Sequence, residues 1–151
     1  MPEKRIVEKA KEDLREGKSP TTAAGEFVHE EMDHIREGKH GARSTKQAIA
    51  IGLSKARRAG IPLKPQKKGA SRRSRRSEQR AYEVGQKKRK PRSPSKRRSR
   101  ATSRALKREG HRAASRKSLS RQARSAAARR GRRARSAASR RGQRTRSRSR
   151  R

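Results

Sequence analysis

Hydrophobic residues recur at intervals of three and four in the first part of this 151-residue chain and become rare after residue 65. This spacing is typical of amphipathic α-helices. It predicts three short helices, near residues 3–16, 20–37 and 45–59. The short links between them favour an antiparallel helical hairpin to which a third helix is added. We therefore expect a small three-helix module over residues 1–65.

The third predicted helix carries the most complete set of start and stop signals in the sequence. Ser44 and Gln47 fit a capping box, in which each side chain accepts a hydrogen bond from the backbone N–H of the other residue. Gly60 supplies a left-handed stop after the last turn, and Gly17 and Gly38 are expected to end the first two helices in the same way.

Large apolar side chains nearly vanish after the module. Residues 66–151 hold only four of them, Tyr82, Val84, Leu106 and Leu119, together with 36 basic and 3 acidic residues. Such a segment repels itself and buries too little apolar surface to offset the chain entropy lost on folding. The predicted fold class is therefore mostly α, with a largely disordered, low-complexity tail over residues 66–151, rich in Arg, Ser and Ala, whose helices are weak or induced by binding.

The charge of the chain indicates a polyanionic partner. The formal net charge is +37, and residues 66–151 contribute +33 of it. Lysine and arginine neutralise backbone phosphates and release condensed counterions, which favours nucleic acid as the partner. No rigid frame for reading base edges is visible, so binding is expected to be independent of sequence.

The candidate nucleic-acid-binding residues are the basic side chains at the end of the third helix and in the densest cationic runs of the tail. They are Lys55, Arg57, Arg58, Lys67, Lys68, Arg72, Arg73, Arg75, Arg76, Lys87, Lys88, Arg89, Lys90, Arg97, Arg98, Arg129, Arg130, Arg132, Arg133, Arg140 and Arg141.

The sequence argues against catalysis, cofactors, metal sites and membrane insertion. Cysteine is absent, which removes thiolate ligands and cysteine nucleophiles. His29 and His34 are five residues apart, whereas a zinc-protease helix needs histidines four apart on one face. Pairing His29 with Asp33, or Glu30 with His34, gives only two ligands, which make a poor site. No apolar run approaches the ~20 residues of a membrane span, and we expect no enzyme, no cofactor and no membrane partner.

The segment KHGARSTKQAIAIGLSKARRAG, residues 39–60, resembles a family of small basic bacterial proteins that is classed only as a domain of unknown function. The shared motif is S-x-K-Q-A-I-A-I-x-L-S-x-A-R-R-A-G. This resemblance implies a bacterial origin and transfers no catalytic residue.

The tail resembles those of linker histones and bacterial histone H1-like proteins, although it is rich in Arg, Ser and Ala rather than Lys, Ala and Pro. The resemblance implies a non-enzymatic DNA-binding protein of the cytoplasm and nucleoid that compacts or bridges duplex DNA. An RNA- or ribosome-binding protein is the alternative, because the phosphate chemistry is the same. Weak self-association of the helical module is a further expectation, through Phe27, Val28, Ile49 and Leu53.

Overall fold

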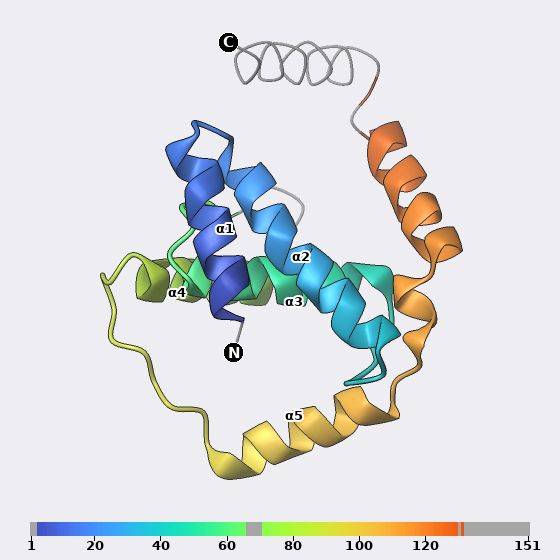
Figure 1. Ribbon diagram of the computed structural model, residues 1–151. Coiled ribbons are helices and arrows are strands. Elements are labelled where there is room, and N and C mark those ends of the chain that lie inside the picture. The colour runs from blue at the N-terminus through green and yellow to red at the C-terminus, as the bar shows by residue number, and fades with distance from the viewer. Residues whose placement is uncertain (1–2, 66–70, 130, 132–151) are drawn as a thin grey trace. The chain divides into compact units, whose positions relative to one another are not determined.

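The computed structural model describes residues 3–65, 71–129 and 131, and all regular structure within them is helical (Figure 1). The chain divides into two compact units, Met1–Ala114 and Ser115–Arg151. In the second unit, residues 116–129 are helical. The elements of the first unit are α1 (Lys4–Arg15), α2 (Pro20–Arg36), α3 (Thr45–Arg58), α4 (Arg72–Gly85), α5 (Lys96–Arg108) and a short 3₁₀ helix, η1 (His111–Ala114).

The three helices predicted for the first part of the chain are confirmed as α1, α2 and α3. Ser44 Oγ accepts a hydrogen bond from Gln47 N–H at 3.2 Å, which is half of the expected capping box. The other half differs, because the Gln47 Oε1 atom accepts from the N–H of Arg43 at 2.9 Å instead of from Ser44. Gly60 has a φ of 98°, the left-handed conformation that was predicted to stop α3.

The core lies where α2 packs against α1 on one side and α3 on the other. Phe27 of α2 is fully buried in it, together with four alanines and Ile61. Gly52 of α3 allows the close approach of α2, since a Cβ atom there would lie 2.8 Å from Val28 Cα. Small side chains thus replace the large apolar ones that the sequence lacks.

The prediction of a largely disordered tail is wrong, because helices continue through α4, α5 and residues 116–129. Each of these three helices is capped by a serine, Ser71, Ser95 or Ser115, whose Oγ accepts a backbone N–H three residues later. Such a cap stabilises a helix by about 1 kcal/mol. Arginine and alanine are also strong helix formers, and these local terms oppose the charge repulsion.

Packing against α3 adds to the stability of α4. Ala81 of α4 is buried, and Gly85 sits so close to the carbonyl of Arg57 that no side chain fits there. The Gln86 Nε2 atom donates to the carbonyl oxygen of Gly60 at 3.0 Å. No local pattern in the sequence predicts this docking, because so few apolar side chains take part in it.

Residues 106–114 also return to the first three helices. The N–H of Gly41 donates to the carbonyl of Leu106 at 2.9 Å, and that of Ala42 donates to Gly110 at 3.2 Å. Thr45 Oγ1 donates to the carbonyl of Ala113 at 2.7 Å. The compact unit therefore continues past residue 65, where the composition changes, and ends at Ala114.

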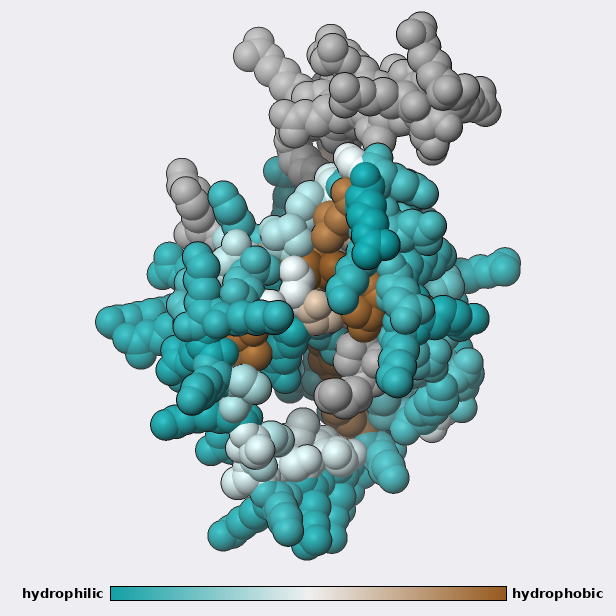
Figure 2. Space-filling view, turned by 60° about the vertical axis from the view of Figure 1, so that its left-hand side comes forward, coloured by the Kyte–Doolittle hydropathy of each residue, from teal (hydrophilic) through white to brown (hydrophobic). Residues whose placement is uncertain are grey.

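Hydrophilic side chains cover most of the face shown in Figure 2, with a narrow band of hydrophobic residues between them. None of the helices in residues 3–65 and 71–129 combines the length and the apolar character needed to cross a membrane.

Candidate nucleic-acid interface

Helix α4 presents a row of arginines from a position fixed by its contacts with α3. Arg72, Arg76 and Arg80 are four residues apart, so their side chains follow one side of the helix. The three are exposed, whereas Ala81 is buried toward α3. The three arginines therefore face solvent on a helix that is packed against α3.

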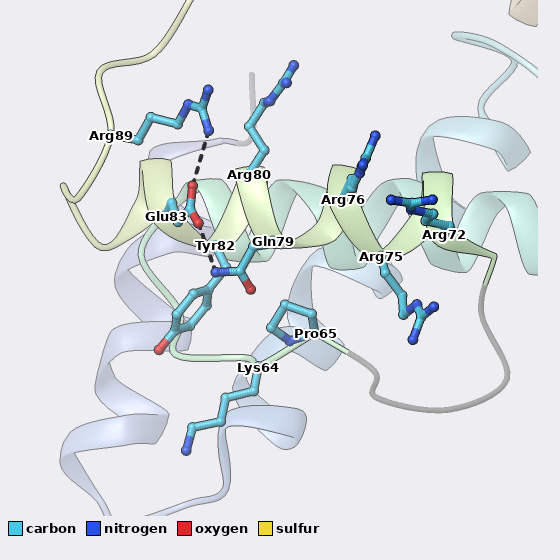
Figure 3. Close-up of a pocket in the computed structure, with 10 residues that line it drawn as sticks. All are labelled: Lys64, Pro65, Arg72, Arg75, Arg76, Gln79, Arg80, Tyr82, Glu83 and Arg89. Carbon is cyan, nitrogen blue, oxygen red and sulfur yellow. Dashed lines mark hydrogen bonds and ion pairs between the residues drawn. The ribbon is translucent and has the colours of Figure 1, made fainter.

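An open pocket of about 840 Å³ runs along α4 (Figure 3). In that view Arg76 and Arg80 extend from one side of the helix, while Arg75, Tyr82 and Lys64 lie on the other. Seven of the ten lining side chains are charged and six of them are basic. The lining residues are Lys64, Pro65, Arg72, Arg75, Arg76, Gln79, Arg80, Tyr82, Glu83 and Arg89.

Glu83 is the acidic residue in this lining, and its charge is already engaged. Gln79 Nε2 donates to Glu83 Oε1 at 2.9 Å, and Arg89 Nη1 lies 3.3 Å from Glu83 Oε2. The hydrogen bond from Gln79, followed by that from Arg89, lowers the pKa of Glu83. Its carboxylate is thus held ionised by hydrogen bonds from Gln79 and Arg89, and Arg80 of the row adds only a weaker attraction without an ion pair.

The arginine row has its charge available for a ligand. Arg72, Arg76 and Arg80 form no ion pair with any acidic side chain among residues 3–65 and 71–129. A guanidinium presents several N–H donors in a planar fork that matches phosphate oxygens. The row can therefore bind consecutive phosphates without first breaking an internal contact.

Most of the predicted binding residues in the described part of the chain are exposed. These are Arg58, Arg72, Arg73, Arg75, Arg76, Lys87, Lys88, Arg89, Lys90, Arg97, Arg98 and Arg129. The predicted residues Lys67, Lys68, Arg130, Arg132, Arg133, Arg140 and Arg141 lie outside the described residues.

Lys55 and Arg57 are placed differently from the others, because both side chains are used inside the fold. The Nζ atom of Lys55 lies 2.6 Å from Glu31 Oε2. Arg57 is 4% exposed, and its guanidinium donates to the carbonyl of Leu63 and to Glu78. Both side chains are therefore occupied inside the fold and do not belong to the exposed cationic surface.

The pocket contains two basic residues and one aromatic residue, Lys64, Arg80 and Tyr82, that were not among the predicted binding residues. Arg80 could have been found from its spacing, since it continues the interval of four from Arg72 and Arg76. Lys64 joins the pocket only because the segment after α3 runs beside α4. That contact is tertiary and leaves no local pattern.

Helix α5 supplies a second cationic surface in the same unit. None of its residues is buried, and basic side chains occur in every turn from Lys96 to Arg108. The backbone contact between Leu106 and Gly41 anchors its C-terminal end. In the second unit, the helix over residues 116–129 carries exposed Arg116, Lys117, Arg121, Arg124 and Arg129.

Among the described residues, the acidic side chains of α2 form their ion pairs within the first three helices and their connections. Glu30 and Glu31 face Lys55, and Asp33 pairs with Arg36 at 3.1 Å.

Phe27, expected at a self-association surface, is fully buried. Its side chain is therefore not available to a second copy of the chain while the fold is intact.

Residues 6–68 match a protein family described as "Family of unknown function (DUF6496)". The match covers the first three helices and agrees with the resemblance of the helical segment to a family of unknown function. It does not extend to α4, α5 or the rest of the tail, so the likeness to histone H1-like proteins stays a prediction. No curated protein and no solved structure matches the chain.

Proposed function

We propose that this protein is a non-enzymatic DNA-binding protein that contacts the phosphate backbone of duplex DNA without reading its sequence. The arginine row of α4 carries the proposal. Arg72, Arg76 and Arg80 are exposed, regularly spaced and without acidic partners in the described chain. A docked helix that bears such a row loses little conformational entropy when it meets a row of phosphates.

Binding energy would come mainly from counterion release. Each neutralised phosphate lowers the slope of log K against log salt by about 0.9 on duplex DNA. Base edges are not read, because long and flexible arginine side chains on a phosphate-facing row carry no fixed donor pattern.

We further propose that the several cationic helices of this chain compact or bridge DNA. The protein would then act as a histone-like protein of the bacterial nucleoid. Once α4 is bound, α5 and residues 116–129 are held close to the same or a second duplex, which raises their effective concentration. The residues beyond 129 add further positive charge.

RNA binding is the second candidate, and Tyr82 favours it. This half-buried ring lines the same pocket as Arg75 and Lys64. Aromatic rings stack on unpaired bases, which RNA loops and single strands offer and intact duplex DNA does not.

The test is a competition between random duplex DNA and structured RNA for the full-length protein over a salt series. DNA binding that is at least as tight as RNA binding, with a steep salt slope and no effect of Tyr82→Leu, is the expected result. A clear RNA preference that Tyr82→Leu removes would select the second candidate. Failure to retard random duplex DNA at low salt would rule out the first.

A further inference from the structure

Two histidines and a glutamate meet where α2 leads into α3. Glu31 and His34 are three residues apart on one face of α2, and His40 lies in the connection between the two helices. One oxygen or nitrogen atom of each lies within 4.8 Å of those of the other two. None of them belongs to the α4 pocket.

Glu31 is a fully buried carboxylate, and neither of its oxygens accepts a hydrogen bond from the described residues. Its Oε2 atom lies 2.6 Å from Lys55 Nζ. Its Oε1 atom has no hydrogen-bond donor among the described residues, and His40 Nε2 lies 3.4 Å away. A buried charged oxygen without a partner is costly, and an ion is one of the few things that relieve that cost.

The hydrogen bond at the other ring nitrogen of His40 indicates which nitrogen carries the hydrogen in the neutral ring. His40 Nδ1 lies 3.2 Å from the carbonyl oxygen of Gly41, which can only accept, so Nδ1 carries a hydrogen. In the neutral ring Nε2 then has a lone pair that faces Glu31 Oε1. Two lone pairs at this distance repel each other, and either a proton on Nε2 or a metal ion between the two atoms removes that repulsion. A backbone carbonyl on the far ring nitrogen is also the usual way in which a metal-binding histidine is oriented.

The side chains around Glu31, His34 and His40 favour a bound cation, and the cluster is accessible from solvent. Glu3 and Glu30 form a second cluster with His34, and one oxygen of Glu30 also lacks a hydrogen-bond donor in the described chain. Lys55 pairs with Glu30 and Glu31, and Arg5 pairs with Glu3, so two positive charges face the three carboxylates. His34 is 15% exposed and borders a pocket of about 340 Å³, which opens a path from solvent.

We propose that Glu31, His34 and His40 bind a divalent transition-metal ion such as Zn²⁺. One carboxylate and two imidazoles form a known zinc ligand set that leaves a fourth position open. Adjacent ligands of a tetrahedral zinc ion lie about 3.3 Å apart, close to the 3.4 Å between His40 Nε2 and Glu31 Oε1. The ligand atom of His34 lies within 4.8 Å of those of Glu31 and His40, so its ring would move toward the ion on binding, while Lys55 contacts the other oxygen of Glu31 and Gly41 the far nitrogen of His40.

The ion would tie the end of α2 to the connection that follows it. That connection contains Gly41 and Ala42, whose N–H groups bind the end of α5 and the residue before η1. A bound ion would therefore strengthen the anchor of α5 on the first three helices.

The experiment is a titration of untagged, chelator-treated full-length protein with Zn²⁺, and with Co²⁺ as a spectroscopic probe. We expect one saturable site per chain, a visible Co²⁺ absorption band and a higher thermal unfolding midpoint with Zn²⁺. His40→Gln and His34→Gln should each weaken binding at least tenfold and remove the rise in the midpoint.

His29→Gln and His111→Gln are the matched controls, because both histidines are exposed and lie outside the cluster. They should leave binding unchanged. Circular dichroism of the metal-free variants checks that each one folds. The proposal is overturned if the full-length protein has no saturable site, as expected if a proton fills the place beside Glu31, or if His34→Gln and His40→Gln bind as the wild type does.

Discussion

Arg57 of α3 reaches Glu78 of α4, with 3.4 Å between Nη2 and Oε2 and only 5% of the arginine side chain exposed. The same guanidinium donates from Nε to the carbonyl of Leu63 at 3.2 Å. A single buried side chain thus joins α3, the segment after it and α4, and the cationic row is positioned by an arginine that does not belong to it.

Replacing this arginine should loosen α4. We expect Arg57→Ala to lower the free energy of unfolding by about 2 kcal/mol, since it removes charged hydrogen bonds from a buried position. The measurement is urea unfolding followed by circular dichroism. Arg58→Ala, at the exposed neighbouring position, should change stability by less than about 0.5 kcal/mol. Equal effects of the two substitutions would contradict this role of Arg57.

The approach of α2 to α3 depends on the missing side chain at Gly52. A methyl group there would lie 2.8 Å from Val28 Cα and 2.9 Å from the carbonyl oxygen of Phe27. Gly52→Ala should therefore destabilise the protein by about 1–3 kcal/mol. Gly25→Ala is the control, because nothing lies within 4 Å of that position. There alanine should stabilise the helix by up to about 1 kcal/mol, so the two substitutions should shift the thermal midpoint in opposite directions.

The carboxyl group of Glu83 should titrate below the ordinary glutamate value of 4.5, chiefly because Gln79 donates to it and then because Arg89 does. Carbon-detected NMR of the side-chain carboxyl measures this pKa directly. Gln79→Leu should raise it more than Arg80→Gln, whose charge acts from farther away. Because the pKa of Glu83 is lower in the folded state, its contacts stabilise α4 fully above pH 4.5. This stabilisation is lost as the pH falls through the folded-state pKa of Glu83.

The arginine row should account for a defined part of the salt dependence of DNA binding. Changing Arg72, Arg76 and Arg80 together to glutamine should reduce the slope of log K against log salt by about 2.7, at about 0.9 per phosphate contact. The slope is measured by fluorescence anisotropy with random duplex DNA.

The matched control removes three exposed basic residues of α1, Lys4, Lys11 and Arg15. It lowers the net charge by the same amount without touching α4. In this control, the slope of log K against log salt should change by less than about 0.9, the value of one phosphate contact. Equal losses in both triple variants would show that total charge, and not the row on α4, determines binding.

The cap of α4 gives a way to separate folding from binding. Ser71 Oγ accepts from Ser74 N–H at 3.1 Å, and Ser71→Ala should cost about 1 kcal/mol. Faster hydrogen exchange of the α4 amides would report this loss. Ser71→Asp should keep the cap while placing a negative charge beside Arg72, so exchange should stay slow and DNA affinity should fall. If aspartate also speeds exchange, Ser71 does not act as a cap.

Local signals were sufficient for the first three helices and insufficient for α4. Ser19, Ser44 and the glycines at 17, 38 and 60 act within one turn of the chain, so the sequence displays them fully. The serine caps of the later helices are equally local, but a cap is worth only about 1 kcal/mol and does not by itself predict a helix in a strongly cationic segment. The docking of α4 could not be read, because it depends on the absence of a side chain at Gly85 and on the buried Arg57.

By itself, the sequence determined where α1, α2 and α3 begin and end, and that the rest of the chain is strongly cationic. Both follow from neighbouring residues and from composition. Only the tertiary structure decided which cations remain available. It turned Lys55 and Arg57 inward to acidic partners and left Arg72, Arg76 and Arg80 exposed. It also brought His40 to Glu31 and His34, because such meetings depend on how helices pack and not on the order of residues along the chain.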